Sequence, residues 1–147
     1  MATAILVAHL ASTLFMTGLI WFVQVVHYPL FANVGRADFA RYEALHTVQT
    51  GWVVMPVMLL ELGTALALVI APPEPLGRWI PVLGLGLLGI VWLTTAVFSV
   101  PAHSALSGGF ADAAHQSLVQ TNWVRTVGWT LRSGLILWVV ATLLRPA

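Results

Sequence analysis

Four long apolar stretches limit what this chain can fold into more than any other feature of its sequence. A helix needs about 20 mainly apolar residues to cross a bilayer, and only helices and closed barrels satisfy their backbone hydrogen bonds there. Of the 147 residues, 59% are hydrophobic and only 7% are charged, whereas a soluble domain has about 25% charged residues. The sequence therefore predicts an all-α integral membrane protein, a bundle of four transmembrane helices at Thr3–Val26, Gly51–Ala71, Trp79–Val100 and Trp123–Leu144.

The connections between these stretches indicate the topology. Residues Pro72–Arg78 are few and rich in helix breakers, so we expect the second and third spans to form a tight antiparallel hairpin. The other two connections, residues 27–50 and 101–122, are longer and emerge together on one side. The first apolar stretch has no basic segment before it and no clear cleavage site after it, so we interpret it as a retained span and not as a signal peptide.

An internal repeat relates the two halves of the chain. The segment VQTGWVV at Val48–Val54 matches VQTNWVR at Val119–Arg125, an offset of 71 residues. We therefore predict a single membrane domain, residues 1–147, built by a 2+2 duplication with repeats at about 1–71 and 79–147. Each repeat holds two spans, so both repeats have the same orientation and are related by an approximate two-fold axis along the membrane normal.

Two charged residues lie inside the predicted spans, where insertion scales put the cost of a central charge at about 2.5–3.5 kcal/mol. Glu61 lies in the second span and Arg132 in the fourth, and the 71-residue offset makes their positions equivalent. We expect the two side chains to pair in the bundle interior. The pair is either a structural link between helices or part of a site that handles a substrate, a cofactor or protons.

Every span has a face that does not suit lipid, and in the third span Trp92, Thr95 and Ser99 form a face that leads to His103. In the first span, spacings of three and four residues align His9, Thr13, Met16, Ile20, Gln24 and His27. In the fourth span the same spacings align Asn122, Arg125, Trp129 and Arg132. Arg125 lies near the predicted start of its span, so it is either an interfacial anchor or a site residue. Glu61 and three residues of the stripe in the fourth span form the set of catalytic candidates: Glu61, Asn122, Arg125 and Arg132.

The histidines supply the most suggestive ligand pattern. Neutral imidazole is the commonest metal ligand and can hold haem iron axially, and bundle cores are usual places for such sites. Four of the five histidines fall near one membrane surface, and one follows a glutamate by three residues, which gives the candidate metal ligands His27, His46, His103, His115 and Glu43. No pair forms a recognised local chelate, and the alternative for each histidine is a hydrogen bond at the interface.

Two histidines of the first span are candidates for binding a cofactor such as haem. His9 and His27 are 18 residues apart, which is about 27 Å along a helix, so they cannot share one metal ion. The order of His9, Trp21 and Tyr28–Phe31 loosely resembles the first span of small bacterial haem-linked proteins with four spans, such as the membrane protoporphyrinogen oxidases. The likeness covers at most one span and its spacing differs, so no residue role follows from it.

Three classes of function remain open for this sequence. The first is an oxidoreductase whose metal- or haem-dependent redox site acts on a hydrophobic or acidic small molecule. In this class the buried arginines and glutamate tune the charge of the site or bind an acidic group. The second is a small proton-coupled transporter with Glu61 as its titrating group. The third is a structural or assembly subunit whose polar faces meet helices of a membrane complex or of a second copy.

Composition narrows the partners and the location. Six arginines and no lysine, scattered along the chain, are too sparse for nucleic-acid binding. The absence of cysteine excludes thiolate metal sites and cysteine nucleophiles. The bilayer itself is the expected surrounding partner, and a bacterial plasma membrane is the expected location.

Overall fold

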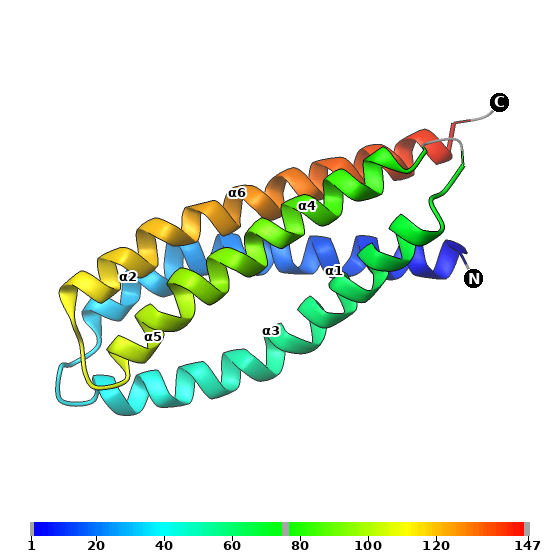
Figure 1. Ribbon diagram of the computed structural model, residues 1–147. Coiled ribbons are helices and arrows are strands. Elements are labelled where there is room, and N and C mark those ends of the chain that lie inside the picture. Colours follow the sequence, from blue (N-terminus) through cyan, green and yellow to red (C-terminus); the bar gives the residue numbers. More distant parts are fainter. Residues whose placement is uncertain (1, 75–76, 146–147) are drawn as a thin grey trace.

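The computed structural model describes residues 2–74 and 77–145, which form helices and turns with no strand among them. Four helical rods run side by side along one axis (Figure 1). The first rod contains α1 (Ala2–Phe22), the π-helix η1 (Val23–His27), α2 (Tyr28–Leu30) and the 3₁₀ turn η2 (Phe31–Asn33). The second is α3 (Phe39–Ile70), the third contains α4 (Trp79–Thr94), the π-helix η3 (Thr95–Ser99) and α5 (Val100–Leu106), and the fourth is α6 (Asp112–Leu143).

The rods alternate in direction, and each is long and apolar enough to cross a membrane. Both chain ends lie at one end of the bundle, and the connections at residues 34–38 and 107–111 lie at the other (Figure 1). We call these the terminal end and the loop end. The helices α1 and α4 each pack against α3 and α6, so α1 and α4, like α3 and α6, are diagonal partners that run in the same direction.

The predicted hairpin between the second and third spans agrees with the antiparallel course of α3 and α4 (Figure 1). Part of the turn predicted at Pro72–Arg78 lies outside the described residues, because residues 75 and 76 are not among them.

The helices extend beyond the predicted spans at the loop end. Most of residues 27–50 and 101–122, predicted as connections, are helical, because α3 begins at Phe39 and α6 at Asp112. A helix of 32 residues is about 48 Å long, whereas the hydrocarbon core of a bilayer is about 30 Å thick. Hydropathy detects only the part of a helix that suits lipid, so it placed the helix starts too late.

The first and third rods each continue through a proline near the loop end, Pro29 or Pro101, by means of a π-helix. The residue before each proline donates its backbone N–H to the carbonyl five residues back, from Tyr28 to Val23 and from Val100 to Thr95. A proline has no N–H and its ring clashes with the carbonyl four residues back. The wider π turn directly before it removes that conflict, so each rod runs on to the loop end.

Packing is closest where small residues or aromatic rings meet. A Cβ atom on Gly128 would lie 2.7 Å from a methyl group of Val91, so glycine lets α6 approach α4 closely. At the loop end, Phe31 and Phe39 are fully buried, with their ring centroids 5.9 Å apart. These rings form part of the apolar core around the histidines.

Candidate functional site

The interior of the bundle is polar over most of its length. Its buried polar side chains form three groups, which we call the terminal, middle and loop layers according to their position along the axis. The stripes predicted in the first and fourth spans are confirmed as inward faces, since their members are buried or, for His27, half-buried.

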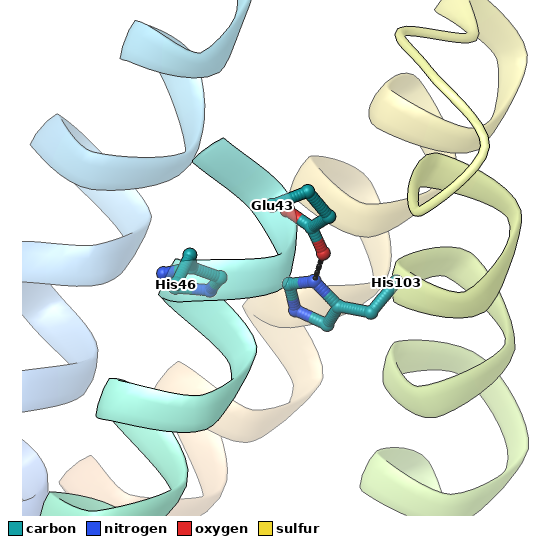
Figure 2. A group of neighbouring side chains, drawn as sticks. All are labelled: Glu43, His46 and His103. Atoms are coloured by element: carbon teal, nitrogen blue, oxygen red, sulfur yellow. Dashed lines mark hydrogen bonds and ion pairs between the residues drawn. The ribbon is translucent and has the colours of Figure 1, made fainter. Parts of the chain in front are cut away.

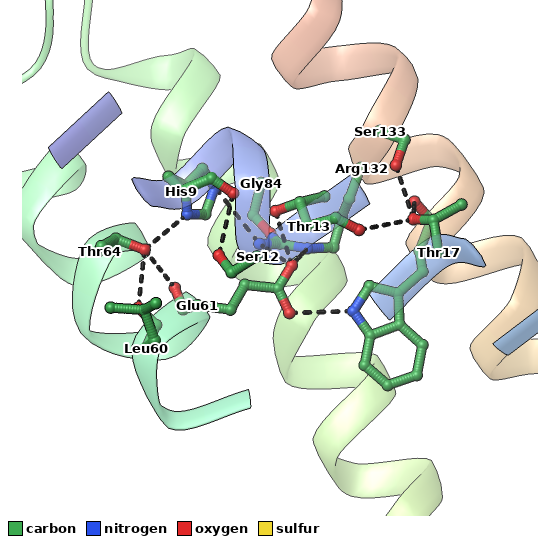
Figure 3. Close-up of polar contacts among 11 residues, drawn as sticks. His9, Ser12, Thr13, Thr17, Leu60, Glu61, Thr64, Gly84, Arg132 and Ser133 are labelled. Carbon is green, nitrogen blue, oxygen red and sulfur yellow. Dashed lines mark hydrogen bonds and ion pairs between the residues drawn. The ribbon is translucent and has the colours of Figure 1, made fainter. Parts of the chain in front are cut away.

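The terminal layer is centred on the carboxylate of Glu61 (Figure 3). Thr13 Oγ1 donates to Glu61 Oε1 over 2.8 Å, and Trp129 Nε1 donates to Oε2 over 2.9 Å. Arg132 donates from Nε and Nη2 to Oε1 over 3.1 and 3.0 Å, and from Nη1 to the Gly84 carbonyl. The predicted pairing of Glu61 with Arg132 is therefore confirmed, and both carboxylate oxygens are hydrogen-bonded.

His9 belongs to this terminal layer and lies apart from the other histidines. Its Nδ1 is hydrogen-bonded to Thr64 Oγ1 over 2.9 Å, and its Nε2 lies 3.5 Å from Arg132 Nη2 (Figure 3). The cavity beside it measures about 40 Å³, whereas pockets for small molecules measure about 300–1,000 Å³. A haem does not fit this surrounding, so we derive no cofactor chemistry at His9.

The middle layer joins α6 to the first and third rods. Asn122 Nδ2 donates to Gln24 Oε1 over 2.9 Å. Arg125 Nη1 donates to Asn122 Oδ1 over 3.1 Å and to Ser99 Oγ over 3.2 Å. The guanidinium of Arg125 also lies 5.5 Å from the ring of Trp129, so the arginine is held inside the bundle and is not an interfacial anchor.

The loop layer brings together three of the four predicted histidines, His27, His46 and His103, and the carboxylate of Glu43. Figure 2 shows His46, His103 and Glu43. His103 Nδ1 is paired with Glu43 Oε1 at 2.5 Å. His46 Nδ1 lies 2.9 Å from His27 Nε2 and 3.1 Å from Thr50 Oγ1. These side chains come from α3, η1 and α5, so residues far apart in the sequence meet because the long helices continue past the predicted span ends.

Three members of the loop layer could hold one metal ion. The ligand atoms of Glu43, His46 and His103 lie within 4.8 Å of one another. Glu43 is fully buried, and its Oε2 accepts no hydrogen bond from the described residues. Both hydrogen bonds of His46 use Nδ1, which leaves Nε2 for a ligand. Two imidazoles and one carboxylate are the donor set of many catalytic zinc and non-haem iron sites, so the residues fit such an ion.

Two other residues support this cluster from outside the ligand set. Tyr28 Oη is hydrogen-bonded to His103 Nε2 over 3.1 Å. His115 Nε2 donates to the Tyr28 carbonyl over 2.8 Å. His115, predicted as a metal ligand, therefore lies near the cluster but uses this nitrogen to hold the backbone of Tyr28. His27 likewise contacts His46 without belonging to the group of three.

A pocket of about 460 Å³ connects the loop and middle layers. It lies between α3 and the η3–α5 segment, and its lining includes His46, His103, Tyr28 and Arg125. Two of the metal-ligand candidates, His46 and His103, and the buried Arg125 therefore line one space. This volume is within the range of pockets that hold small molecules.

Sequence reasoning did not single out several residues that complete the site. Gln24 was placed on the correct face, but nothing in the sequence linked it to Asn122. Tyr28 precedes a proline and was expected to lie in a connection, so nothing in the sequence indicated its contact with His103. Trp92 is different, because helical spacing placed it with Thr95 and Ser99 on the face of the third span that leads to His103, and all three line the pocket. A polar residue inside an apolar span is the one general signal that could have identified Gln24.

Comparison with protein-family models, with curated proteins and with solved structures finds no match to this chain. Its function must therefore be inferred from the geometry of its side chains.

Proposed function

We propose that this chain is a membrane-embedded protein that binds a divalent transition metal at Glu43, His46 and His103 and uses it for redox chemistry on a lipid-soluble or acidic small molecule. The observation that carries the proposal is the buried group of two imidazoles and one carboxylate, with an unpartnered carboxylate oxygen, beside a pocket of substrate size. That donor set, with further positions open, is typical of non-haem iron(II) sites and also of catalytic zinc sites.

The distribution of charge and polarity supports a membrane location. The exposed charged side chains of the described residues all lie at the two ends of the bundle: Arg36, Asp38, Arg41 and Asp112 at the loop end, and Glu74, Arg78 and Arg145 at the terminal end. The surface between them is dominated by apolar side chains, while the interior holds hydrogen-bonded polar groups. This is the reverse of a soluble domain and suits a bilayer.

A 2+2 duplication of the bundle has further support in the backbone. The first and third rods run in the same direction, and each has a π-helix directly before its proline, at Val23–His27 and Thr95–Ser99. The second and fourth rods are also parallel and supply Glu61 and Arg132 to one ion pair. A two-fold axis between diagonal partners accounts for both features.

Each residue of the cluster has a defined task in this proposal. Glu43, His46 and His103 hold the metal, which supplies the ability to change oxidation state or to polarise a bound oxygen. The Tyr28 hydroxyl orients His103 through a hydrogen bond to His103 Nε2. A metal held by Nε2 would displace this hydroxyl, whereas a metal held by Nδ1 would replace the proton between His103 and Glu43. Thr50 and His27 fix the ring of His46. Partners of this kind contribute about 10–100-fold to metal affinity.

Metal content measured on the purified protein tests the proposal. The protein in detergent is incubated with iron(II), zinc, manganese or copper, freed of excess metal, and analysed by mass spectrometry for metal per chain. We expect about one ion per chain, lost on His46→Ala and on Glu43→Gln because a three-ligand site cannot spare a donor. Asp112→Asn is the matched control, since Asp112 is an exposed carboxylate at the same end that pairs only with Arg36 among the described residues.

The outcomes separate clearly. Binding that is retained in His46→Ala and Glu43→Gln, or lost equally in Asp112→Asn, contradicts the proposed site. Absence of stoichiometric metal in a folded, monodisperse wild-type protein contradicts the metal proposal itself.

A second candidate function, proton transfer without a metal, is favoured by one specific observation. The hydroxyl of Tyr28, the ring of His103 and the carboxylate of Glu43 form a continuous chain of hydrogen bonds, and a histidine between two such groups is suited to shuttle protons. Proton flux into liposomes that is lost in His103→Gln and kept in Asp112→Asn, from a protein that binds no metal, would favour this function.

A further inference from the structure

The pocket between α3 and the η3–α5 segment opens on the apolar side of the bundle. Met55 and Val100, at its rim, are 46% and 59% exposed. Its deeper lining includes buried Met58 and Arg125. Residues of the rim face the surface that suits lipid, so a molecule dissolved in a bilayer could enter without crossing the loop end.

Two buried N–H groups on residues that line this pocket have no acceptor. Arg125 is only 7% exposed, and both of its hydrogen bonds, to Ser99 and Asn122, use Nη1. Its Nε and the Nε1 of Trp92 are buried and donate to no acceptor among the described residues. Arginine Nε and tryptophan Nε1 only donate hydrogen bonds. Each nitrogen exposes less than 1 Å², so a ligand that brings acceptor oxygens reaches them only when the two side chains turn toward the pocket.

The charge of Arg125 indicates which oxygens these are. The ion pairs of the described residues involve Arg36, His103 and Arg132, and none includes Arg125. Glu43, a carboxylate near the same pocket, is already paired with His103. A buried cation is strongly disfavoured unless an opposite charge or hydrogen-bond partners compensate it. An arginine edge matches the geometry of a carboxylate, which can accept two parallel hydrogen bonds.

We propose that this pocket binds the carboxylate of a lipid-soluble acid of the fatty-acid class. The carboxylate accepts hydrogen bonds from Arg125 Nε and Trp92 Nε1, and the hydrocarbon chain lies against Val54, Met55 and Met58 toward the bilayer. Arg125 thereby gains a counter-charge and the two unpaired N–H groups gain acceptors. Binding at Arg125 does not require the metal, but the role of the acid as a substrate rests on the proposed function of the neighbouring Glu43, His46 and His103.

Calorimetric titration with lauric acid and with methyl laurate tests the inference. The wild-type protein is placed in nanodiscs of phosphatidylcholine, so that no anionic lipid competes, and metal is removed with a chelator. We expect lauric acid to bind and methyl laurate to bind at least about 10-fold more weakly, because the ester has no charge to pair with Arg125. Arg125→Gln and Trp92→Phe should weaken the binding of lauric acid about 10-fold and several-fold, in line with the loss of a charged and a neutral hydrogen bond.

Matched controls use residues of the same type elsewhere in the chain. Arg36→Gln removes an arginine exposed at the loop end, and Trp79→Phe removes a tryptophan that is 83% exposed. Both variants should bind lauric acid as the wild type does. The ester comparison needs no mutation, so it decides the question even where Arg125→Gln does not fold.

The two proposals fail in different ways. Equal binding of acid and ester, or unchanged binding of the acid by folded Arg125→Gln, overturns this inference whatever the metal content. Charge-dependent binding of lauric acid by a protein that takes up no metal supports the carboxylate pocket and contradicts only the metal proposal. Stoichiometric metal without any binding of lauric acid overturns the carboxylate pocket alone.

Discussion

Glu61 accepts hydrogen bonds from side chains on two other helices. Thr13 of α1 and Trp129 and Arg132 of α6 together engage both of its oxygens. A carboxylate that carries protons must exchange partners readily, whereas this one is fully enclosed and its residue is 0% exposed. The contacts therefore favour the structural alternative for the Glu61–Arg132 pair, and they make its contribution to stability measurable.

A double-mutant cycle on this pair should reveal strong coupling. Glu61→Gln leaves a buried Arg132 without its counter-charge, and we expect the free energy of unfolding to fall by about 3 kcal/mol. Arg132→Met should cost a similar amount, because it leaves the carboxylate unpaired. The double variant should lose less than the sum of the two, since it leaves no unpaired charge. Unfolding by denaturant in detergent measures all four free energies.

The exposed pair of Arg36 and Asp112 provides the control for this cycle. Its side chains are 70% and 71% exposed, and exposed ion pairs contribute about 0–1 kcal/mol. Arg36→Gln should therefore change the free energy of unfolding very little. Losses that simply add in the double variant of Glu61 and Arg132 would contradict a direct pair.

At the scale of the helical element, the π-helix η3 sets the direction in which the residues after it point. One residue more than an α-helical turn requires is accommodated within Thr95–Ser99. Each residue of an α-helix turns the chain by about 100°, so this extra residue determines which face of α5 carries His103. The same relation holds for η1 and the residues Tyr28 and Phe31 that follow it.

Deletion of Val97 should test this role of η3. Val97 is 52% exposed on the outside of the bundle, so its side chain contributes little packing. Its removal restores α-helical spacing and turns His103 away from Glu43 by about 100° relative to the rest of the helix. We expect metal affinity to fall by about 100-fold, the upper end of the effect of disturbing an orienting partner, measured as metal bound per chain by the folded, monodisperse variant.

The substitution Val97→Ala is the matched control for this deletion, because it trims the same side chain and keeps the register. It should bind metal as the wild type does. Metal binding that survives the deletion would show that η3 does not position His103.

The difference between predicted and observed elements has one physical origin. Apolar length predicted the four helices and their number, and helical spacing predicted the inward faces that carry Glu61 and Arg132. Hydropathy could not place the helix ends, because polar residues near an interface are as compatible with a helix as with a loop. Nothing in the sequence indicated the π turns before Pro29 and Pro101, which only the backbone reveals. The meeting of Glu43 with His103, 60 residues apart, depends on those extensions and could not be derived from local spacing.

For the whole molecule, the polar interior and apolar exterior suit a bundle that spans a bilayer, and they leave its direction in the bilayer open. Two exposed arginines lie at the loop end, Arg36 and Arg41, and two lie at the terminal end, Arg78 and Arg145. The excess of positive charge that orients membrane proteins toward the cytoplasm is therefore nearly balanced. The loop end is the informative one, because it determines the side on which the metal ligands lie.

Cysteine labelling can establish both the insertion and the orientation, since the chain has no cysteine of its own. Ala37→Cys and Ser107→Cys place thiols in the exposed connections of the loop end, and Glu74→Cys and Arg145→Cys place them at the terminal end. A maleimide that does not cross membranes should label one pair in intact cells and the other pair in inverted vesicles, because four crossings put the two ends on opposite sides. Val53→Cys, on a side chain 49% exposed between the ends, should resist labelling in both, since a thiol in hydrocarbon does not ionise to the reactive thiolate.

If Ala37→Cys and Glu74→Cys react from the same side of a sealed membrane, the bundle does not span it. If the pairs separate as expected, the pair that reacts in intact cells identifies the outward end, and hence whether Glu43, His46 and His103 lie on the outer or the cytoplasmic side.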